Sequence, residues 1–308
     1  MPKVTLLAGG VGGAKMAEGL AALDDVELTV IGNIADDEQF HGLWVSPDID
    51  TVTYTLAGLI DRSQGWGVAD EGLRALGVLE ALGEHTWMTL GDKDLGLHIY
   101  RTMRRAEGDR PSDIARHIAK AFGVVPTIVL PTDDWMQTRL VTDIGPLSFQ
   151  EYFVREQCRP EVLEIWFEGV EFAKPTPEAL EALEKADLIV LAPSNPLVSL
   201  DPILAIPGMH DAVVEAPAPV IAVSPLIAGK TVKGPAARMM ESQGLESSAL
   251  GIARHYQGLV DTLVIDAQDT DLRNDIEALG MEVSATDILM PDQERKREVA
   301  AHLLEVAL

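Results

Sequence analysis

Short apolar runs alternate with amphipathic stretches along most of this chain, and that alternation predicts its fold. Mostly apolar runs occur at positions 4–8, 27–31, 187–192, 219–223 and 262–265. Such runs are typical of strands that are buried on both faces of a parallel sheet. Stretches with helical spacing follow or separate the later runs, at positions 234–243, 247–256, 272–279 and 293–306. The pattern therefore predicts an α/β fold with a doubly wound, mostly parallel, Rossmann-like sheet.

The stretch from residue 132 to residue 175 has a different pattern. Strand-like alternation occurs at 138–142, 146–154 and 164–172, and no convincing helix lies among them. We therefore expect one α/β domain over residues 1–308 that carries an inserted antiparallel β-rich subdomain at 132–175. Ahead of the insertion, the spacing predicts helices at 51–62, 70–82, 95–106 and 112–122. It also predicts one strand, at 124–130.

Four glycines follow the first apolar run. They are Gly9, Gly10, Gly12 and Gly13, and a helical pattern comes after them. Strand, glycine turn and helix open a βαβ unit, in which backbone N–H groups at the turn can meet an anion. Only a residue without Cβ adopts positive φ cheaply and lets a phosphate approach the main chain. A tight turn without a ligand explains this stretch equally well, because the G-x-G-x-x-G pattern ends at Lys15 and no G-K-[ST] sequence is present.

Two aspartates precede the helix that is expected from residue 51. Asp48 and Asp50 are separated by one residue, so their side chains would share a face in extended backbone. Such a pair could hold Mg²⁺ together with waters and substrate phosphates, or one of them could act as a general base for a hydroxyl. An N-cap pair without a catalytic role is the alternative. Asp36 and Asp37 are expected to be solvated, as adjacent acids in a loop usually are.

Two further residues stand out in this half of the chain. Lys93 belongs to the tetrapeptide Gly-Asp-Lys-Asp at 91–94, which is expected to follow a strand. It could bind a phosphate or a ligand carbonyl, and a capped turn with a local ion pair is the alternative. Trp66 lies between two glycines and could stack on a planar ring, although packing is the commoner use of a tryptophan.

The turns after the later strands also carry polar groups. Ser194, Asn195 and Ser224 could donate hydrogen bonds to a nucleobase or a phosphate, or they could belong to ordinary strand-end turns. Gly234 and the proline after it open a predicted helix, which makes a second candidate anion site. In doubly wound sheets ligands bind beyond the carboxyl ends of the strands, and most of these polar groups fall there.

The composition restricts the partners. The formal net charge is −25, from 49 acidic and 24 basic residues. This argues against nucleic acid or an anionic membrane, which would need a basic surface. The one cysteine, Cys158, excludes an internal disulfide and suits a reducing compartment. Because the start has no signal-peptide pattern and no apolar run approaches the roughly 20 residues of a membrane span, we expect a cytoplasmic protein.

Seven stretches of the chain occur in the order of one known enzyme family. They are GGVGGAK at 9–15, SPDIDTVTY at 46–54, WG at 66–67, LGDKDLGLHI at 90–99, APSNP at 192–196, AVSPLI at 222–227 and GPAARMM at 234–240. They resemble the 2-phospho-L-lactate transferases of coenzyme F420 biosynthesis. The resemblance implies transfer of a phosphorylated three-carbon acid from a guanosine-diphosphate-linked donor to the ribityl hydroxyl of the deazaflavin FO. It also implies release of GMP and a requirement for Mg²⁺.

The resemblance also implies roles for individual residues. Asp50 and Lys93 would contact the deazaflavin acceptor. Family members carry either Arg or Lys at the position of Lys93, and Arg would offer a bidentate fork that Lys lacks. The glycine turn and the serine-containing turns would hold the donor nucleotide, which gives the set Gly9, Gly10, Gly12, Gly13, Lys15, Ser194, Asn195, Ser224 and Gly234.

This chemistry agrees with the separate interpretation of the acids. In-line attack on phosphorus needs an oriented hydroxyl, a neutralised phosphate and a good leaving group. We therefore expect Asp48 and Asp50 to be the catalytic pair, one as metal ligand and the other activating the hydroxyl. The deazaflavin ring is flat and apolar, so we also expect an apolar cleft near Trp66 and the helix after Asp50.

Two other functions remain as alternatives. A nicotinamide-dependent oxidoreductase would use the same fold, but the glycine pattern is incomplete and Gly32-Asn33, not an acid, follow the second strand. A guanine-nucleotide-binding regulatory protein would bind nucleotide without turnover. Among transferases, the donor could carry phospholactate, phosphoenolpyruvate or phosphoglycerate. The apolar helices near the C-terminus also leave room for a homodimer.

Overall fold

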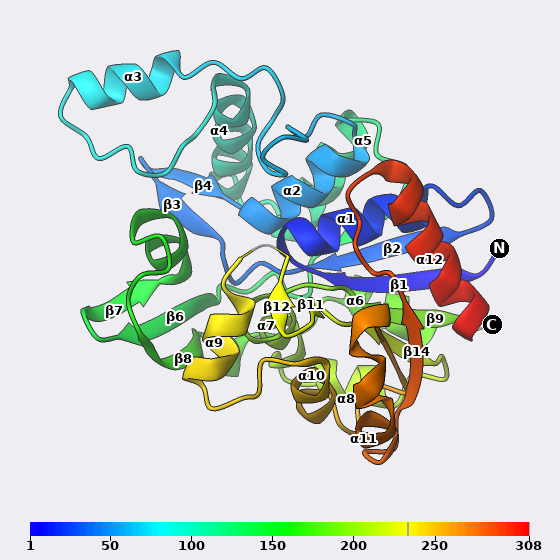
Figure 1. Cartoon of the computed structure of the whole chain (residues 1–308). Coiled ribbons are helices and arrows are strands. Elements are labelled where there is room, and N and C mark those ends of the chain that lie inside the picture. Colours follow the sequence, from blue (N-terminus) through cyan, green and yellow to red (C-terminus); the bar gives the residue numbers. More distant parts are fainter. Residues whose placement is uncertain (233, 308) are drawn as a thin grey trace.

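A seven-stranded parallel sheet forms the centre of the computed structural model, which describes residues 1–232 and 234–307 (Figure 1). Every neighbouring pair in this sheet is parallel. The strand order is β14 (Glu282–Thr286), β13 (Thr262–Asp266), β10 (Val220–Val223), β9 (Leu188–Leu191), β1 (Lys3–Ala8), β2 (Glu27–Gly32) and β5 (Thr127–Val129). The predicted α/β, doubly wound fold is confirmed. The order reverses between β1 and β9, and this is the point where such sheets bind ligands.

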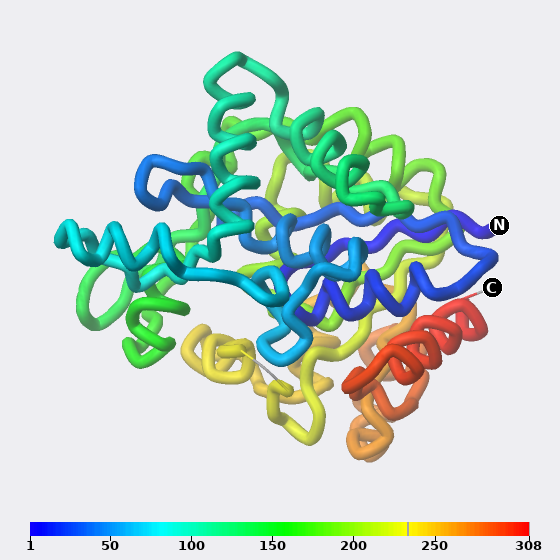
Figure 2. Tube along the Cα trace, turned by 90° about the horizontal axis from the view of Figure 1, so that it is seen from above, coloured from blue at the N-terminus to red at the C-terminus, as the bar shows by residue number. Residues whose placement is uncertain are grey.

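Helices cover both faces of the sheet. They are α1 (Gly10–Ala21), α2 (Pro47–Leu56), α3 (Arg74–Ala81), α4 (Asp92–Ala106), α5 (Pro111–Ala121), α6 (Pro177–Glu184), α7 (Asp201–Leu204), α8 (Met209–Val214), α9 (Ala236–Ser242), α10 (Ala249–His255), α11 (Arg273–Glu277) and α12 (Gln293–Ala307). Helices α1 and α12 lie side by side on one face (Figures 1 and 2). Helix α6 lies on the other, where Thr5 Oγ1 of β1 donates to the carbonyl of Ala182. Within the described ranges, no helix combines the length and the apolar character needed to cross a bilayer.

The apolar runs form strands because the sheet buries them from both sides. All four residues of β9 and of β10 are buried, and so is every residue of β1 after Lys3. Strand β14 was not predicted from the sequence. It lies at the edge of the sheet and only one of its residues is fully buried, so it lacks a continuous apolar run.

Smaller antiparallel sheets lie beside the carboxyl ends of the large sheet (Figure 1). One has three strands, β7 (Gly145–Ser148), β6 (Gln137–Thr142) and β8 (Val162–Glu168). It lies within the stretch predicted to hold an antiparallel insertion. The others are the hairpins β3 (Glu38–Phe40)–β4 (Leu43–Val45) and β11 (Leu226–Ile227)–β12 (Lys230–Thr231).

Short helical turns complete the chain. They are η1 (Glu151–Arg155), η2 (Val170–Phe172), η3 (Pro196–Leu200) and η4 (Ala267–Leu272). Turn η1 occupies the second half of the strand predicted at 146–154, so that part of the prediction is wrong. Its residues alternate in hydrophobicity, but the segment folds back after β7 instead of extending it.

Two helices begin earlier than predicted. Helix α2 begins at Pro47, with Ser46 as N-cap, so the acids at 48 and 50 lie inside its first turn and not in extended backbone. Helix α4 begins at Asp92 with Gly91 as N-cap, so the tetrapeptide at 91–94 starts a helix and does not follow a strand. In both cases the acidic side chains occupy the N-terminal turn, where the helix dipole favours negative charge.

Helices α1 and α12 approach each other at Gly19. A Cβ at this position would lie 2.3 Å from the carbonyl oxygen of Lys296. This is far inside ordinary van der Waals contact, and a backbone atom cannot rotate away as the end of a side chain can. The contact fixes α12 against the helix that follows the glycine turn.

We predict that Gly19→Ala lowers the free energy of unfolding by about 1–3 kcal/mol, as overpacking usually does. Gly77→Ala in α3 is the matched control, because a Cβ there meets no atom within 4 Å. It should leave stability unchanged or raise it by up to about 1 kcal/mol, through helix propensity. Urea unfolding measures both variants. Equal stability of Gly19→Ala and wild type would contradict the close packing.

Candidate active site

A cavity of about 400 Å³ lies at the carboxyl ends of the parallel strands. Its walls come from the start of α1, the start of α2, the loop around Trp66, the insertion near Phe149 and the turns after β9 and β10. Most of the predicted site residues line it, namely Gly9, Gly10, Gly12, Lys15, Asp48, Asp50, Trp66, Ser194, Asn195, Ser224 and Gly234. Gly13 and Lys93 lie outside this lining.

The glycine turn is packed against its neighbours more tightly than a side chain would allow. A Cβ on Gly9 would lie 2.7 Å from Oδ2 of Asp48, and one on Gly12 would lie 2.1 Å from the carbonyl oxygen of Pro193. Gly10 alone among these adopts a positive φ, of 58°. The glycines therefore bring the first turn of α1 against α2 and the turn after β9. This first turn lines the cavity, and the N–H groups at the start of a helix lack intrahelical partners.

Asp48 lies beside this helix N-terminus. Its Oδ2 accepts a hydrogen bond from Nδ2 of Asn33 at 3.0 Å. Burial raises the pKa of Asp48 to about 6, although the hydrogen bonds from Asn33 and the backbone of Gly10 lower it. Asn33 follows β2, where a dinucleotide-binding protein would place an acid for the ribose. In this chain the position serves to orient Asp48.

Asp36 faces the same cavity and is buried, as is Asp37. The expectation that these two acids are solvated is therefore wrong. Asp37 accepts hydrogen bonds from Trp44 of β4 and from Ser46, and Thr138 of β6 lies beside Asp36, so folding brings other segments over both acids. Burial, and next the charge of Asp48, raise the pKa of Asp36 well above its ordinary value. One of its oxygens, Oδ1, has no hydrogen-bond partner.

Asp50 has different partners. Both of its oxygens accept hydrogen bonds from Arg101, one of them from Nη1 at 3.1 Å. Nδ1 of His98 lies 3.8 Å from Oδ2. The expected shared face of Asp48 and Asp50 is wrong, because residues two apart on a helix point in different directions. Asp48 points toward Asn33 and the glycine turn, and Asp50 points toward α4.

Helix α4 supplies a row of polar groups that the sequence interpretation did not assign to the site. Asp94, His98 and Arg101 lie on one face of α4, at spacings of four and three residues. Asp94 accepts a hydrogen bond from Oη of Tyr54 at 2.6 Å. Burial, aided by the charge of Arg101, lowers the pKa of His98 to about 4, so its imidazole is neutral at pH 7. Their spacing of four and three residues was the signal available in the sequence, because it places all three side chains on one face of a helix.

The turns after β9 and β10 use their polar groups locally. Oγ of Ser194 donates to the carbonyl of Gly9 at 2.7 Å, and Oγ of Ser224 donates to the carbonyl of Leu226 at 3.0 Å. Oδ1 of Asn195 accepts from the N–H of Leu197. These side chains line the cavity and hold its walls in shape.

Of the residues expected to contact the acceptor, Trp66 lies on the cavity wall and Lys93 does not. Trp66 lines the cavity and is 41% exposed. Lys93 is exposed, and its Nζ donates to the carbonyl of Ala69 at 2.6 Å, at the end of the loop that carries Trp66. The lysine therefore lies behind this loop and not on the cavity wall.

The charges of the cavity bear on what it can bind. Carboxylates of Asp36, Asp48, Asp50 and Asp94 line it, whereas Lys15 is the cation among its described lining residues. No cluster of three or more His, Cys, Asp or Glu side chains in the described ranges is placed to hold a metal alone. Mg²⁺, however, commonly binds through one or two carboxylates and substrate phosphates. Asp36 and Asp48 fit that donor set, because both are buried, both line the cavity, and the charge of Asp48 raises the pKa of Asp36.

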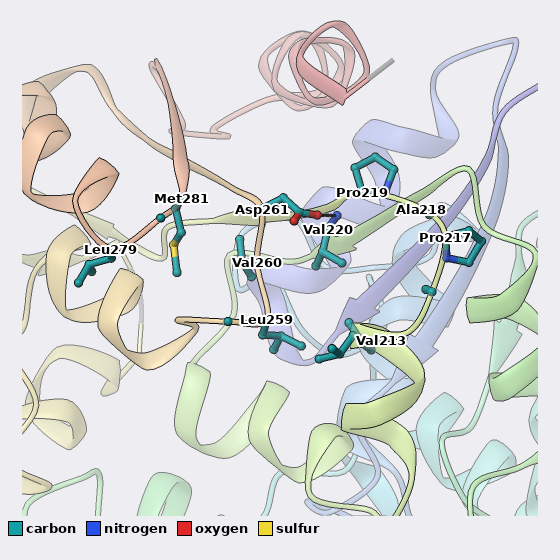
Figure 3. A pocket seen from close by; sticks show the side chains of 14 residues that line it. Val213, Pro217, Ala218, Pro219, Val220, Leu259, Val260, Asp261, Leu279 and Met281 are labelled. Carbon is teal, nitrogen blue, oxygen red and sulfur yellow. Dashed lines mark hydrogen bonds between the residues drawn. The ribbon is translucent and has the colours of Figure 1, made fainter.

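Another cavity, of about 560 Å³, lies at the opposite edge of the sheet, before β10, β13 and β14 (Figure 3). Most of its described lining residues carry apolar side chains. The carboxylate there, Asp261, already accepts a hydrogen bond from the N–H of Val220 at 2.8 Å. The cavity at the carboxyl ends is therefore the one equipped for chemistry.

The sequence matches the family described as 2-phospho-L-lactate transferase CofD over residues 4–305. The chain belongs to this family. The stretches that carried the resemblance, including the glycine turn and the turn with Ser194, meet at this one cavity.

Individual relatives of the CofD family cover nearly the whole chain. A phosphoenolpyruvate transferase of Streptomyces griseus subsp. griseus is 38% identical over 99% of this chain and 98% of that protein. A 2-phospho-L-lactate transferase of Methanopyrus kandleri is 37% identical over 99% and 97%. A crystal structure of a Bacillus halodurans protein, a member of the UPF0052 family, has a TM-score of 0.63 and 18% identity over 98% of both chains. That structure supports the fold.

The buried ion pair yields a stability prediction. Arg101→Leu leaves the carboxylate of Asp50 buried without a partner, so it should lower the free energy of unfolding by about 3–5 kcal/mol. Combining it with Asp50→Asn removes the unpaired charge and should recover most of that loss. Urea unfolding of the two variants decides, and equal stability of the single and double variants would contradict the pairing.

The contact of Asn33 yields a pH prediction. Its hydrogen bond stabilises the charged form of Asp48, so Asn33→Ala should raise the pKa of Asp48 further above about 6. Asn195→Ala is the control, because this amide lines the same cavity but contacts Met239 and Leu197. Carboxyl ¹³C NMR between pH 4 and pH 9 follows both. An unchanged or lowered pKa in Asn33→Ala would contradict the assignment.

Proposed function

We propose that this protein transfers a phosphorylated three-carbon acid from a guanosine-diphosphate-linked donor to the ribityl hydroxyl of the deazaflavin FO. The product GMP is released, and the reaction belongs to coenzyme F420 biosynthesis. The observation that carries the proposal is a single cavity with two unlike halves. One half joins the N-terminus of α1 to the buried acids Asp36 and Asp48, and the other is apolar and aromatic. Membership of the CofD family supports it, as do relatives named for phospholactate and phosphoenolpyruvate transfer.

The polar half suits the donor diphosphate. N–H groups of the first turn of α1 and the ammonium of Lys15 favour phosphate oxygens. The carboxylates of Asp36 and Asp48 repel them, so an anionic donor needs a cation at this point. These two carboxylates would hold Mg²⁺, which supplies charge neutralisation of the phosphates when bound. We propose Asp36 as the partner of Asp48 in place of Asp50, because Arg101 occupies both oxygens of Asp50.

The apolar half suits the deazaflavin ring. Trp66 and Tyr54 come from one side, and Phe149 and Phe153 come from the insertion. The two phenylalanine rings stack at 5.5 Å between centroids. Flat apolar rings gain most from such walls, since aromatic faces bury large areas in offset stacks.

Asp50 also lines the cavity and would orient the attacking hydroxyl. Burial raises the pKa of Asp50, but the ion pair with Arg101 favours its charged form, and each oxygen retains a lone pair for a further hydrogen bond. The hydroxyl oxygen forms a bond to the phosphorus that carries the three-carbon acid. The bond from this phosphorus to the GMP oxygen breaks, and the hydroxyl proton leaves through Asp50 to solvent. Ser194, Asn195, Ser224 and Gly234 also line the cavity, and we propose that they contact the rest of the donor nucleotide.

The deciding experiment is an assay of GMP release from FO and each guanylylated donor, carrying phospholactate, phosphoenolpyruvate or phosphoglycerate. We expect Mg²⁺-dependent turnover with one preferred donor. Binding of GDP without turnover by any donor would favour the regulatory alternative, and binding of NADH would favour the oxidoreductase. The homodimer and the cytoplasmic location stay predictions, the first to be measured by light scattering.

We predict that Asp48→Asn and Asp36→Asn each reduce turnover at least about 100-fold, since each removes a charge from the phosphate site. Asp50→Ala should also abolish turnover, because the acceptor hydroxyl loses its partner. Asp24→Asn, an exposed acid outside the cavity, is the control and should retain wild-type rates. Isothermal titration with Mg²⁺ and donor separates the roles. Weakened metal binding in the first two variants but not in Asp50→Ala is the expected result, and the reverse would contradict the assignment.

A further inference from the structure

A buried carboxylate on α1 binds two cations from distant parts of the chain. Glu18 is 8% exposed. Its Oε2 accepts from Nζ of Lys296 at 2.6 Å, and its Oε1 accepts from Nη2 of Arg62 at 2.6 Å. Nη1 of Arg62 also lies 3.3 Å from Oε2, so the guanidinium grips both oxygens. No role in the proposed reaction has been given to these three residues.

The two cations come from segments that border the cavity on either side of α1. Lys296 lies on α12, and the segment 288–290 just before this helix lines the cavity. Arg62 lies in the loop 57–69 between α2 and α3, which carries Trp66. Glu18 therefore ties both rims of the cavity to the helix that follows the glycine turn.

The loop with Arg62 behaves as one compact unit. Ile60 and Val68 are buried and form an isolated bridge at its base. Above them, the N–H of Asp61 donates to Gly67 at 2.9 Å, and the N–H of Gly65 donates to Asp61 at 2.7 Å. Because these bonds close the turn on itself, a shift at Arg62 moves Trp66 as well.

The cations differ in what they do for folding. Lys296 is 7% exposed and already neutralises the buried Glu18. Arg62 is 55% exposed at the side chain, and ion pairs of such residues add little to global stability. The second cation is thus not needed to bury the acid. What it adds is a fixed position for the loop.

We propose that Arg62 is a positioning residue for acceptor binding. Its ion pair with Glu18 holds the loop 57–69 against α1, and so places the ring of Trp66 as one wall of the apolar half of the cavity. The inference rests on the proposed function in taking the ligand of that half to be a flat aromatic acceptor.

The test compares Arg62→Gln with Arg254→Gln in the deazaflavin assay. Arg254 has the same side-chain exposure of 55% and also pairs with one glutamate, Glu246, and neither residue lines the cavity. Arg62→Gln should raise the KM for the acceptor about threefold, the scale of one exposed ion pair, and leave the KM for the donor unchanged. Arg62→Lys should restore part of the loss, and Arg254→Gln should match wild type.

Two further readouts separate positioning from a general structural effect. Raising ionic strength screens an exposed pair, so it should bring the acceptor KM of wild type toward that of Arg62→Gln. Trp66→Phe combined with Arg62→Gln should give less than the product of the single effects, because both act through the same ring. Multiplicative effects, or an unchanged acceptor KM in Arg62→Gln, would overturn the inference alone. Absence of turnover in wild type with every donor would overturn the proposed function, and the inference with it.

Discussion

The contact between the first turn of α1 and its neighbours is the constraint on which the cavity depends. Gly9 and Gly12 approach Asp48 and Pro193 too closely for any side chain. This contact places the positive end of α1 beside a buried acid whose hydrogen bonds come from Asn33 and the backbone of Gly10. The tightness of the glycine turn is therefore inseparable from the chemistry of the site, because loosening it would move Asp48 away from the helix terminus.

Burial of acids gives the site its second property. A chain with a net charge of −25 could leave its carboxylates in water, yet Asp36 and Asp48 are placed together where burial raises the pKa of both. Keeping two buried carboxylates charged costs free energy without a cation, and a bound cation offsets that cost. Burial raises the pKa of Asp50 as well, but the charge of the buried Arg101 beside it opposes that shift. Asp48 and Asp50, only two residues apart, thus differ in their chemistry. Asp48 lies in a pair of acids that a cation would stabilise, whereas Asp50 is paired with Arg101.

Prediction from sequence succeeded where the local pattern of apolar residues reflects how the folded protein buries a segment. The continuous apolar runs of β9 and β10 exist because both faces of those strands are covered, and so they indicated a parallel sheet. The pattern failed at β14, whose edge position relaxes the demand for apolar residues. It also failed at Asp36 and Asp37, because the residues around them, Trp44 and Ser46 at Asp37 and Thr138 at Asp36, are brought there by folding.

The sequence by itself determined the fold class, the family resemblance and a set of candidate residues most of which line the cavity. Strand ends, glycines and turn residues are local features, and the topology of a doubly wound sheet gathers them at one edge. Only the tertiary structure decided how these groups pair. Asp48 with Asn33, Asp50 with Arg101 and Glu18 with Arg62 are each contacts between separate elements. Their partners are chosen by helix phase and packing, which sequence spacing alone does not contain.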